Sequence, residues 1–123
     1  MGRRDSNDKE WQAVKERVRF RDKEDRILKI LTGPEYLILK RNAGIQLQIL
    51  DPAHYLAVSE RPDLCYKSYN IVLLNRYSHE NLDRFKNPIN GDPITKEEVK
   101  EWWIRILKGN KVQYDYLLNK NLI

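Results

Sequence analysis

The apolar residues of the chain first recur with the period of an α-helix. Trp11, Val14 and Val18 are spaced three or four residues apart among charged residues, and this spacing places them on one face of a helix. Asn7 or Asp8 can cap that helix, because an Asn or Asp side chain accepts hydrogen bonds from the first backbone N–H groups. The pattern therefore predicts a helix of about a dozen residues near the start of the chain.

Further along, the period shortens to that of a β-strand. Ile45, Leu47 and Ile49 alternate with glutamines, which predicts a half-buried strand that ends just before His54. Residues 70–75 are rich in strand formers and predict a second strand. The mostly polar stretch between the two strands is expected to form a long loop.

Gly33 and Pro34 interrupt the apolar residues that precede this strand pair. A short strand is predicted over residues 27–31, and the Gly–Pro pair is expected to end it. Residues 36–39 are apolar and fit either a strand or a helical turn. The pattern of this segment leaves the two alternatives open.

The C-terminal part of the chain predicts helices with clear boundaries. A breaker-rich run over residues 87–93 separates it from the strand pair. Thr95 and Glu98 form a capping box, in which each side chain bonds the backbone N–H of the other residue. This box opens a predicted helix that runs to about Leu107, and residues 112–118 predict a last short helix.

Helical and strand segments therefore mix along the chain, which predicts an α+β fold. A chain of 123 residues is long enough for one domain with a modest core, and we expect this domain to span residues 9–123. Residues 1–8 are polar, include two arginines and lack apolar periodicity. We expect them to form a flexible basic arm.

Charge and cysteine content narrow the classes of function. Lys and Arg total 23 against 18 Asp and Glu, which gives a net charge of +5 and a pI near 9.3; this surplus favours a polyanionic partner such as DNA. The single cysteine, Cys65, excludes an internal disulfide and a zinc site with several thiolates, and fits a reducing cytoplasm. The sequence contains no apolar run of about 18 residues and no signal-peptide pattern, so we expect neither a membrane partner nor secretion.

Both histidines of the chain lie in the strand–loop–strand segment and the short helix predicted after it. Ser78 can cap this helix, whose first turn carries His79 and whose next turn places Asp83 on the same face. His54 is a candidate general base, because an imidazole titrates near neutral pH. His79 is a candidate metal ligand, and Asp83 can supply a second ligand or a hydrogen bond to His79.

The order of strand, histidine, loop, asparagine, strand, histidine and helix resembles the HNH endonuclease motif. Ala53–His54, Asn70 and His79 carry the resemblance, and Asn70 lies sixteen positions after His54 and nine before His79. The resemblance implies a ββα-metal core over residues 45–86, flanked by an N-terminal helix and C-terminal helices. It also implies that Asn70 either braces the loop bearing the base or contacts the metal. The chain resembles small stand-alone bacterial or phage members that lack the CxxC zinc pairs.

Ala53 departs from the pattern of many HNH enzymes, which carry an acidic residue or histidine there as a metal ligand. Asp51 would alternate onto the opposite face of the strand unless Pro52 distorts it, so Asp51 is the less favoured helper. The expected ligands are His79, Asp83 and Asn70 with water, and Asp51 as that helper. The expected cofactor is one divalent metal ion, Mg²⁺ or Mn²⁺ in the first place, with Zn²⁺ or Ni²⁺ as alternatives.

Three arginines are candidates for contacts with DNA phosphates. Arg76, three residues before His79, is preferred, and Arg19 and Arg21 lie on the polar face of the first predicted helix. A solvated amphipathic face is the favoured explanation of Arg19 and Arg21.

The sequence thus predicts a metal-dependent endonuclease that hydrolyses DNA phosphodiester bonds, with His54 as general base and one metal ion around His79. Two alternatives stay open. The first is a non-catalytic nucleic-acid-binding module on a decayed HNH scaffold, suggested by Ala53 and the missing zinc pairs. The second is a structural protein that associates through its Trp and Tyr residues.

Overall fold

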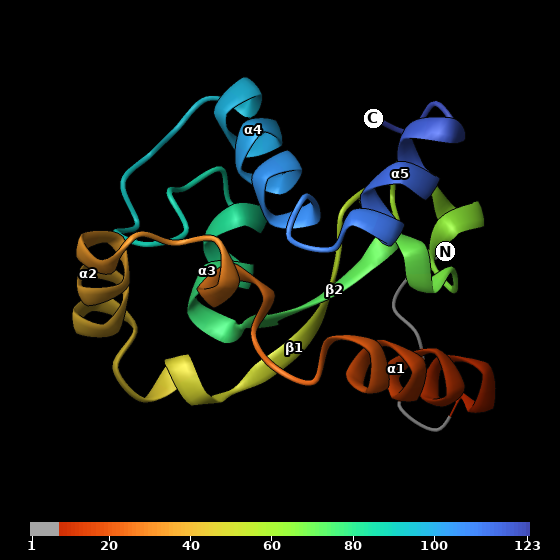
Figure 1. Ribbon diagram of the computed structural model, residues 1–123, viewed down its shortest axis with the longest axis horizontal. Coiled ribbons are helices and arrows are strands. Elements are labelled where there is room, and N and C mark those ends of the chain that lie inside the picture. Colours follow the sequence, from red (N-terminus) through yellow and green to blue (C-terminus); the bar gives the residue numbers. More distant parts are fainter. Residues whose placement is uncertain (1–7) are drawn as a thin grey trace.

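The computed structural model describes residues 8–123, and Figure 1 shows helices and strands mixed over this range. The described residues form five α-helices and one antiparallel sheet of two strands, which confirms the α+β class. The helices are α1 (Lys9–Asp22), α2 (Gly33–Ala43), α3 (Arg76–Asp83), α4 (Lys96–Leu107) and α5 (Lys111–Asn119), and the strands are β1 (Leu50–His54) and β2 (Ile71–Asn75). The predicted arm lies outside the described residues except for Asp8, which caps α1 by accepting hydrogen bonds from Glu10 and Trp11.

The strand pair forms the centre of the fold, with α1 on one side and α4 and α5 on the other (Figure 1). Every residue of β2 is buried. Ile71 and Leu73 pack in a cluster with α1, whereas Val72 and Leu74 belong to a larger cluster that includes residues of α4 and α5. Because successive side chains of a strand point to opposite faces, β2 joins two apolar layers.

The first strand of the pair lies later in the chain than predicted. Residues Gly44–Gln48 form a 3₁₀ helix, and β1 covers Leu50–His54 and contains the histidine. Pro52, which lacks an N–H group, lies inside this strand opposite Leu73. Proline is tolerated there because both strands of a two-stranded sheet are edge strands.

The strand predicted over residues 27–31 is also wrong. Arg26–Lys29 forms a 3₁₀ helix, which Asp25 caps by accepting a hydrogen bond from the N–H of Ile27. The Asp25 carboxylate satisfies a backbone N–H that would otherwise need a partner strand. The apolar residues of this segment can therefore reach the core without forming a strand.

Gly33 and Pro34 begin a helix instead of ending a strand. Thr32 and Glu35 form a capping box at the start of α2, and Pro34 lies in its first turn. The missing N–H of proline costs nothing there, because the first N–H groups of a helix have no partner within the helix. The alternative of a helical turn for residues 36–39 is therefore the correct one.

The capping box of Thr95 and Glu98 is confirmed, with both hydrogen bonds present at the start of α4. The last predicted helix is confirmed as α5, which begins after its N-cap Asn110. The helix predicted after the strand pair is α3, but its N-cap is Asn75 and not Ser78.

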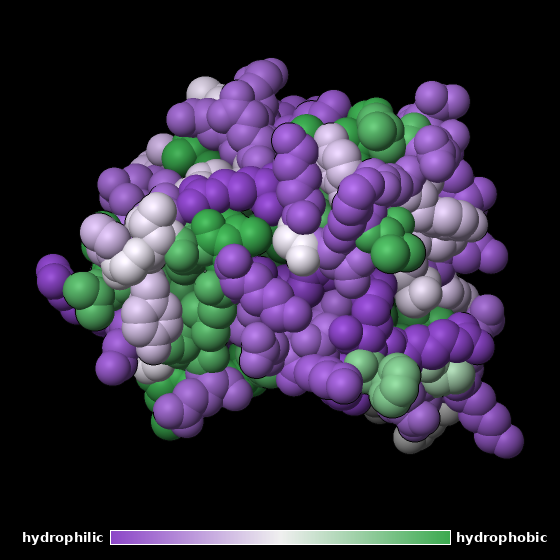
Figure 2. Space-filling view, viewed as in Figure 1, coloured by the Kyte–Doolittle hydropathy of each residue, from purple (hydrophilic) through white to green (hydrophobic). Residues whose placement is uncertain are grey.

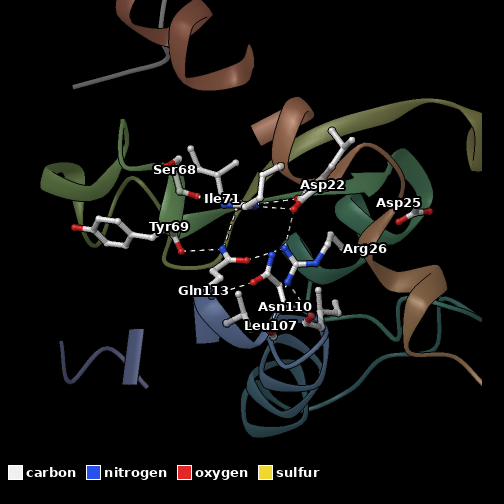
Figure 3. Close-up of polar contacts among 12 residues, drawn as sticks. Asp22, Asp25, Arg26, Ser68, Tyr69, Ile71, Leu107, Asn110 and Gln113 are labelled. Carbon is white, nitrogen blue, oxygen red and sulfur yellow. Dashed lines mark hydrogen bonds and ion pairs between the residues drawn. The ribbon is translucent and has the colours of Figure 1, made fainter. Parts of the chain in front are cut away.

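A buried polar cluster joins the two layers, and we call Asp22, Arg26 and Gln113 the Arg26 network (Figure 3). The Arg26 guanidinium, in a residue only 1% exposed, donates to Asp22 Oδ1 at 3.0 Å and to Gln113 Oε1 at 2.7 Å. It also donates to the carbonyl of Ile106 at 3.2 Å, and Asp22 accepts from the N–H of Leu73 at 2.9 Å. The network therefore ties α1, β2, α4 and α5 to one another.

Apolar side chains also reach the surface. Figure 2 shows them gathered at the left of the view, around α2 and the segment that follows it, and Leu37 and Ile45 are exposed there. In the part of the chain that the structure describes, every helix is too short or too polar to span a lipid bilayer.

Candidate active site

The elements β1, β2 and α3 form a continuous unit that carries both histidines. His54 is the last residue of β1, and His79 lies in α3, which starts directly after β2. Asn75 fixes this junction: its Oδ1 accepts from the N–H of Ser78 at 2.8 Å, and its Nδ2 donates to the buried carboxylate of Asp25 at 2.8 Å. The side chain that caps α3 is therefore itself anchored to a buried residue of the core.

A groove of about 710 Å³ runs between this unit and α4. Its lining includes His54, His79 and Asp83, three of the predicted site residues. The remaining walls are the segment that follows His54, Phe85 and one face of α4. The structure thus brings the predicted base and two of the four predicted metal ligands, His79 and Asp83, to one concave surface.

The ring of His54 is held from two sides. Its Nε2 lies 2.9 Å from the backbone carbonyl oxygen of Cys65, and the ring stacks on Trp11 with centroids 5.6 Å apart and planes 14° apart. Because a carbonyl oxygen only accepts hydrogen bonds, Nε2 must carry the hydrogen, and in the neutral ring the lone pair is on Nδ1. The neutral ring therefore carries its hydrogen on Nε2.

Asn70 braces the loop that follows His54. The residue is completely buried; its Oδ1 accepts from the N–H of Leu56 at 2.8 Å, and its Nδ2 donates to the carbonyls of Leu56 at 3.0 Å and Leu64 at 3.4 Å. It immediately precedes β2, which starts at Ile71, and it lies outside the lining of the groove. These contacts fit the bracing role and do not fit the predicted metal contact.

His79 lies between two carboxylates. Its Nδ1 is 3.2 Å from Asp51 Oδ2, and its Nε2 is 3.3 Å from Asp83 Oδ2. Burial by itself lowers the pKa of His79, but the hydrogen bonds and charges of Asp83 and Asp51 outweigh burial and raise this pKa. The ring is therefore stabilised in its charged form when only these two acids surround it.

Asp51 acts on His79 from outside the groove. Asp51 pairs with Leu74 in the sheet and is not part of the groove lining, whereas His79 and Asp83 are. Burial raises the pKa of Asp51, and hydrogen bonds from Arg76 and His79 lower it more strongly, so this pKa is below its usual value. An ionised Asp51 fixes the orientation of the His79 ring through Nδ1. Asp51 therefore contacts the predicted ligand His79 directly, where the sequence suggested only a secondary metal ligand.

The three predicted phosphate contacts have different environments. Arg76 holds Asp51 with two hydrogen bonds, at 3.2 and 3.0 Å, yet its side chain is 43% exposed. Arg21 binds Asp22 and the carbonyl of Ser68 at 2.9 Å, so its guanidinium already has partners within the fold, and its contact with DNA stays a prediction. Arg19 is exposed on α1.

Two lysines that the sequence analysis did not select line the groove. Lys96 and Lys100 are exposed and lie one turn apart on α4, on the same wall as Val99 and Trp103. The signal that could have identified them is their four-residue spacing beside the apolar stripe of the helix, which places them at the edge of the buried face. Trp11, taken only as a packing residue, proves to be a neighbour of His54.

The groove has few protein ligands for a metal ion. Across residues 8–123, no three His, Cys, Asp or Glu side chains are grouped to hold one. The pair His79 and Asp83 fits as two neighbouring ligands: its atoms lie 3.3 Å apart, between the roughly 3.0 Å that octahedral Mg²⁺ would require and the roughly 3.4 Å of a tetrahedral Zn²⁺ site. A divalent ion bound here would take its other ligands from water or phosphate oxygens, as Mg²⁺ commonly does.

Comparisons with known proteins gave no relatives: a scan against protein-family models, a search of curated proteins and a search of solved structures each found no match.

Proposed function

We propose that this chain is a metal-dependent endonuclease of the HNH type, which hydrolyses DNA phosphodiester bonds in this groove. The observation that carries the proposal is the meeting of His54 with the His79–Asp83 pair on one concave surface. The order β1, β2, α3 and the brace at Asn70 agree with the ββα-metal arrangement that the sequence resembles. Basic side chains on the opposite wall supply the charge that DNA requires.

His54 would act as the general base. Hydrolysis needs a group that removes a proton from the attacking water, and the tautomer set by the Cys65 carbonyl leaves Nδ1 as the basic nitrogen. Stacking on Trp11 limits rotation of the ring. A ring fixed in this way meets the positional demand of general base catalysis.

His79 and Asp83 would hold the divalent ion, and Asp51 would orient His79 through its Nδ1. When bound, such an ion neutralises charge on the phosphate and on the leaving oxygen. Before the ion binds, the carboxylates favour a proton on His79, so ion binding requires the loss of that proton. Lys96 and Lys100 would contact the DNA backbone, as exposed lysines in such grooves do.

A plasmid-nicking assay tests the proposal. Supercoiled plasmid is incubated with the protein in EDTA, Mg²⁺, Mn²⁺, Ni²⁺ or Zn²⁺, and the conversion to open circle is measured. We expect nicking with at least one of these ions and none in EDTA, and loss of nicking in Asp83→Asn. The matched control is Asp115→Asn, since Asp115 is also exposed and also pairs with a cation four residues earlier on its helix, Lys111. Equal activity of the two variants would contradict the assignment of Asp83.

One observation favours a second candidate, a non-catalytic DNA-binding module on the same scaffold. Ala53 occupies the position before the base where a ligand is common in HNH enzymes, and no group of three metal-binding side chains occurs in the described range. Calorimetric titration with Mg²⁺ and Mn²⁺, with and without DNA, separates the two candidates. DNA binding without any binding of these ions would favour the module, and ion binding that is lost in Asp83→Asn would favour the nuclease.

A further inference from the structure

The backbone of Phe85 adopts the left-handed conformation directly after α3, with φ of 58°. The N–H of Phe85 bonds the carbonyl of Leu82 at 3.3 Å, and the N–H of Lys86 bonds the carbonyl of Asn81 at 2.8 Å. This pair of hydrogen bonds is the Schellman ending of a helix, in which the left-handed position is usually glycine and sometimes asparagine. The chain therefore has an aromatic residue where helix geometry favours no side chain.

Helix geometry and burial do not account for this choice. The Cβ atom of any L-residue is crowded in the left-handed region, and glycine avoids this crowding. The Phe85 residue is 52% exposed, so burial of the ring offsets only part of the free-energy cost of the left-handed conformation. Of the described residues, the two other non-glycine positions with positive φ are Lys23 and Asn121, neither of which is aromatic. Strain of this kind is characteristic of positions that serve binding or catalysis.

The position of Phe85 suggests what the ring contacts. Phe85 lines the groove together with Asp83 and His79 of α3, and Lys96 and Lys100 lie on the facing wall. The backbone that carries the ring is held in place, because the carbonyl of Phe85 accepts from the N–H of Ile94 at 3.0 Å and Lys86 pairs with Pro93 in an isolated bridge. An exposed aromatic ring beside cations in one groove is the combination with which proteins bind single-stranded nucleic acid.

We infer that Phe85 stacks on an unpaired base of the DNA strand whose backbone occupies the groove. The inference rests on the proposed function, because the same groove is taken to bind DNA, and it adds the class of substrate. In a duplex the faces of the bases are covered by their neighbours, so the ring can stack only where the strand is unpaired or frayed. The preferred substrate is therefore DNA with unpaired bases beside the cleaved phosphate.

Fluorescence anisotropy with a labelled single strand and with its blunt duplex tests the inference. Both are measured in EDTA with the full chain carrying His54→Ala, so that cleavage cannot interfere. Phe85→Ala is expected to weaken single-strand binding by about 5- to 100-fold and duplex binding by less than about twofold. Phe85→Trp should retain single-strand affinity. The control is Phe20→Ala, since Phe20 is 80% exposed and lies on α1, outside the groove lining.

A second readout separates stacking from loss of structure. A single strand containing 2-aminopurine should lose fluorescence when it binds the protein with Phe85, and keep it when it binds Phe85→Ala. Phe85→Gly should bind as weakly as Phe85→Ala while its thermal midpoint is no lower than that of the parent chain, because glycine suits the left-handed position. Equal losses on single strand and duplex, unchanged binding of Phe85→Ala, or no DNA binding by the parent chain would overturn the inference.

These outcomes distinguish the inference from the proposed function. Selective single-strand binding that depends on Phe85, in a wild-type protein that nicks no DNA with any of the tested ions, would support the inference and contradict the nuclease. Metal-dependent nicking whose preference for unpaired over duplex DNA is unchanged in Phe85→Ala would support the nuclease and overturn the inference.

Discussion

Two clusters in this molecule place a cation between polar partners, and they differ in their access to solvent. In the Arg26 network the guanidinium is buried and its partners come from three separate helices, α1, α4 and α5. At His79 the imidazole is partly exposed, faces a groove and has two carboxylates as partners. The buried cluster can only hold the fold, because no ligand reaches it. The open cluster can exchange a proton or a carboxylate contact for a bound ion.

The electrostatics of the two clusters differ in the same way. Burial raises the pKa of Asp22, but hydrogen bonding and charge from Arg21 and Arg26 lower it more strongly, so Asp22 is ionised and permanently paired. Arginine stays charged at any ordinary pH, whereas histidine changes charge near neutrality. The first cluster therefore keeps its charges at any ordinary pH, whereas the charge of the second can change near neutral pH.

The largest effect is expected from breaking the buried cluster. Arg26→Ala should lower the free energy of unfolding by about 2–3 kcal/mol, because Gln113 and Asp22 each lose a buried hydrogen-bond partner that water cannot replace, although Asp22 keeps Arg21. Urea unfolding followed by circular dichroism measures this loss. The control is Arg76→Ala, which removes a more exposed arginine–aspartate pair and should cost far less, because solvent screens such a pair. Similar losses in the two variants would remove the distinction between the clusters.

The next effect concerns the residue that connects the core to the site. Asn75→Ala removes the N-cap of α3 and the hydrogen bond to Asp25, and should cost about 1–3 kcal/mol. Because α3 carries His79, the nicking rate should also fall. Thr95→Ala, which removes the exposed cap of α4, is the control: it should cost about 1 kcal/mol without a loss of nicking. A nicking rate in Asn75→Ala equal to that of Thr95→Ala would contradict the role of Asn75 in positioning α3.

A third pair, Glu35 with Arg105, tests how exposure to solvent limits the contribution of an ion pair to the free energy of unfolding. The hydrogen bond from Arg105 lowers the pKa of Glu35 from 4.5 to about 2. A carboxylate with a lowered folded pKa stabilises the protein above its unfolded pKa, and this stabilisation is lost as pH falls from about 4.5 through about 2. Because both side chains are partly exposed, we expect only about 1 kcal/mol from the pair. The loss of unfolding free energy between pH 5 and pH 2 should be about 1 kcal/mol smaller in Glu35→Gln than in the wild type; an equal loss in the two proteins would be evidence against it.

The smallest effect is expected at the wall of the groove. Lys96→Ala and Lys100→Ala should each reduce the slope of log affinity for duplex DNA against log salt by about 0.9, because each phosphate contact releases condensed counterions. Lys111→Ala, which removes an exposed lysine of α5 outside the groove lining, should leave the slope unchanged. An equal change in all three variants would indicate non-specific attraction in place of a binding groove.

Local signals in the sequence predicted the parts of the fold that depend on local chemistry. The cap at Asp8 and the box of Thr95 and Glu98 are side chain–backbone contacts within a few residues, and the structure contains them. The same logic, applied to Thr32 and Glu35, would have identified the start of α2. The spacing of His54, Asn70 and His79 singled out the two histidines that line the groove and the asparagine that binds the loop after His54.

The features that the sequence did not predict depend on contacts between distant segments. The alternation over residues 45–49 has the period of a strand, but strand pairing is decided by the partner, and β2 pairs with Leu50–His54. Arg21 lies on a polar helix face, and only the fold shows that the carbonyls of Ser68 and Ile71 accept from it. The stacking of Trp11 on His54 spans more than forty residues of sequence and has no local signal.

The central claim is that His54 promotes metal-dependent cleavage of DNA in the groove. The most direct test compares wild type and His54→Ala on supercoiled plasmid, in the ion that supports nicking, with DNA affinity measured separately in EDTA. We predict a nicking rate at least about 100-fold lower in His54→Ala, as expected for the loss of a general base, with affinity within about twofold of the wild type. An unchanged nicking rate in His54→Ala, or a wild-type protein that binds DNA and nicks it with none of the ions, would contradict the claim.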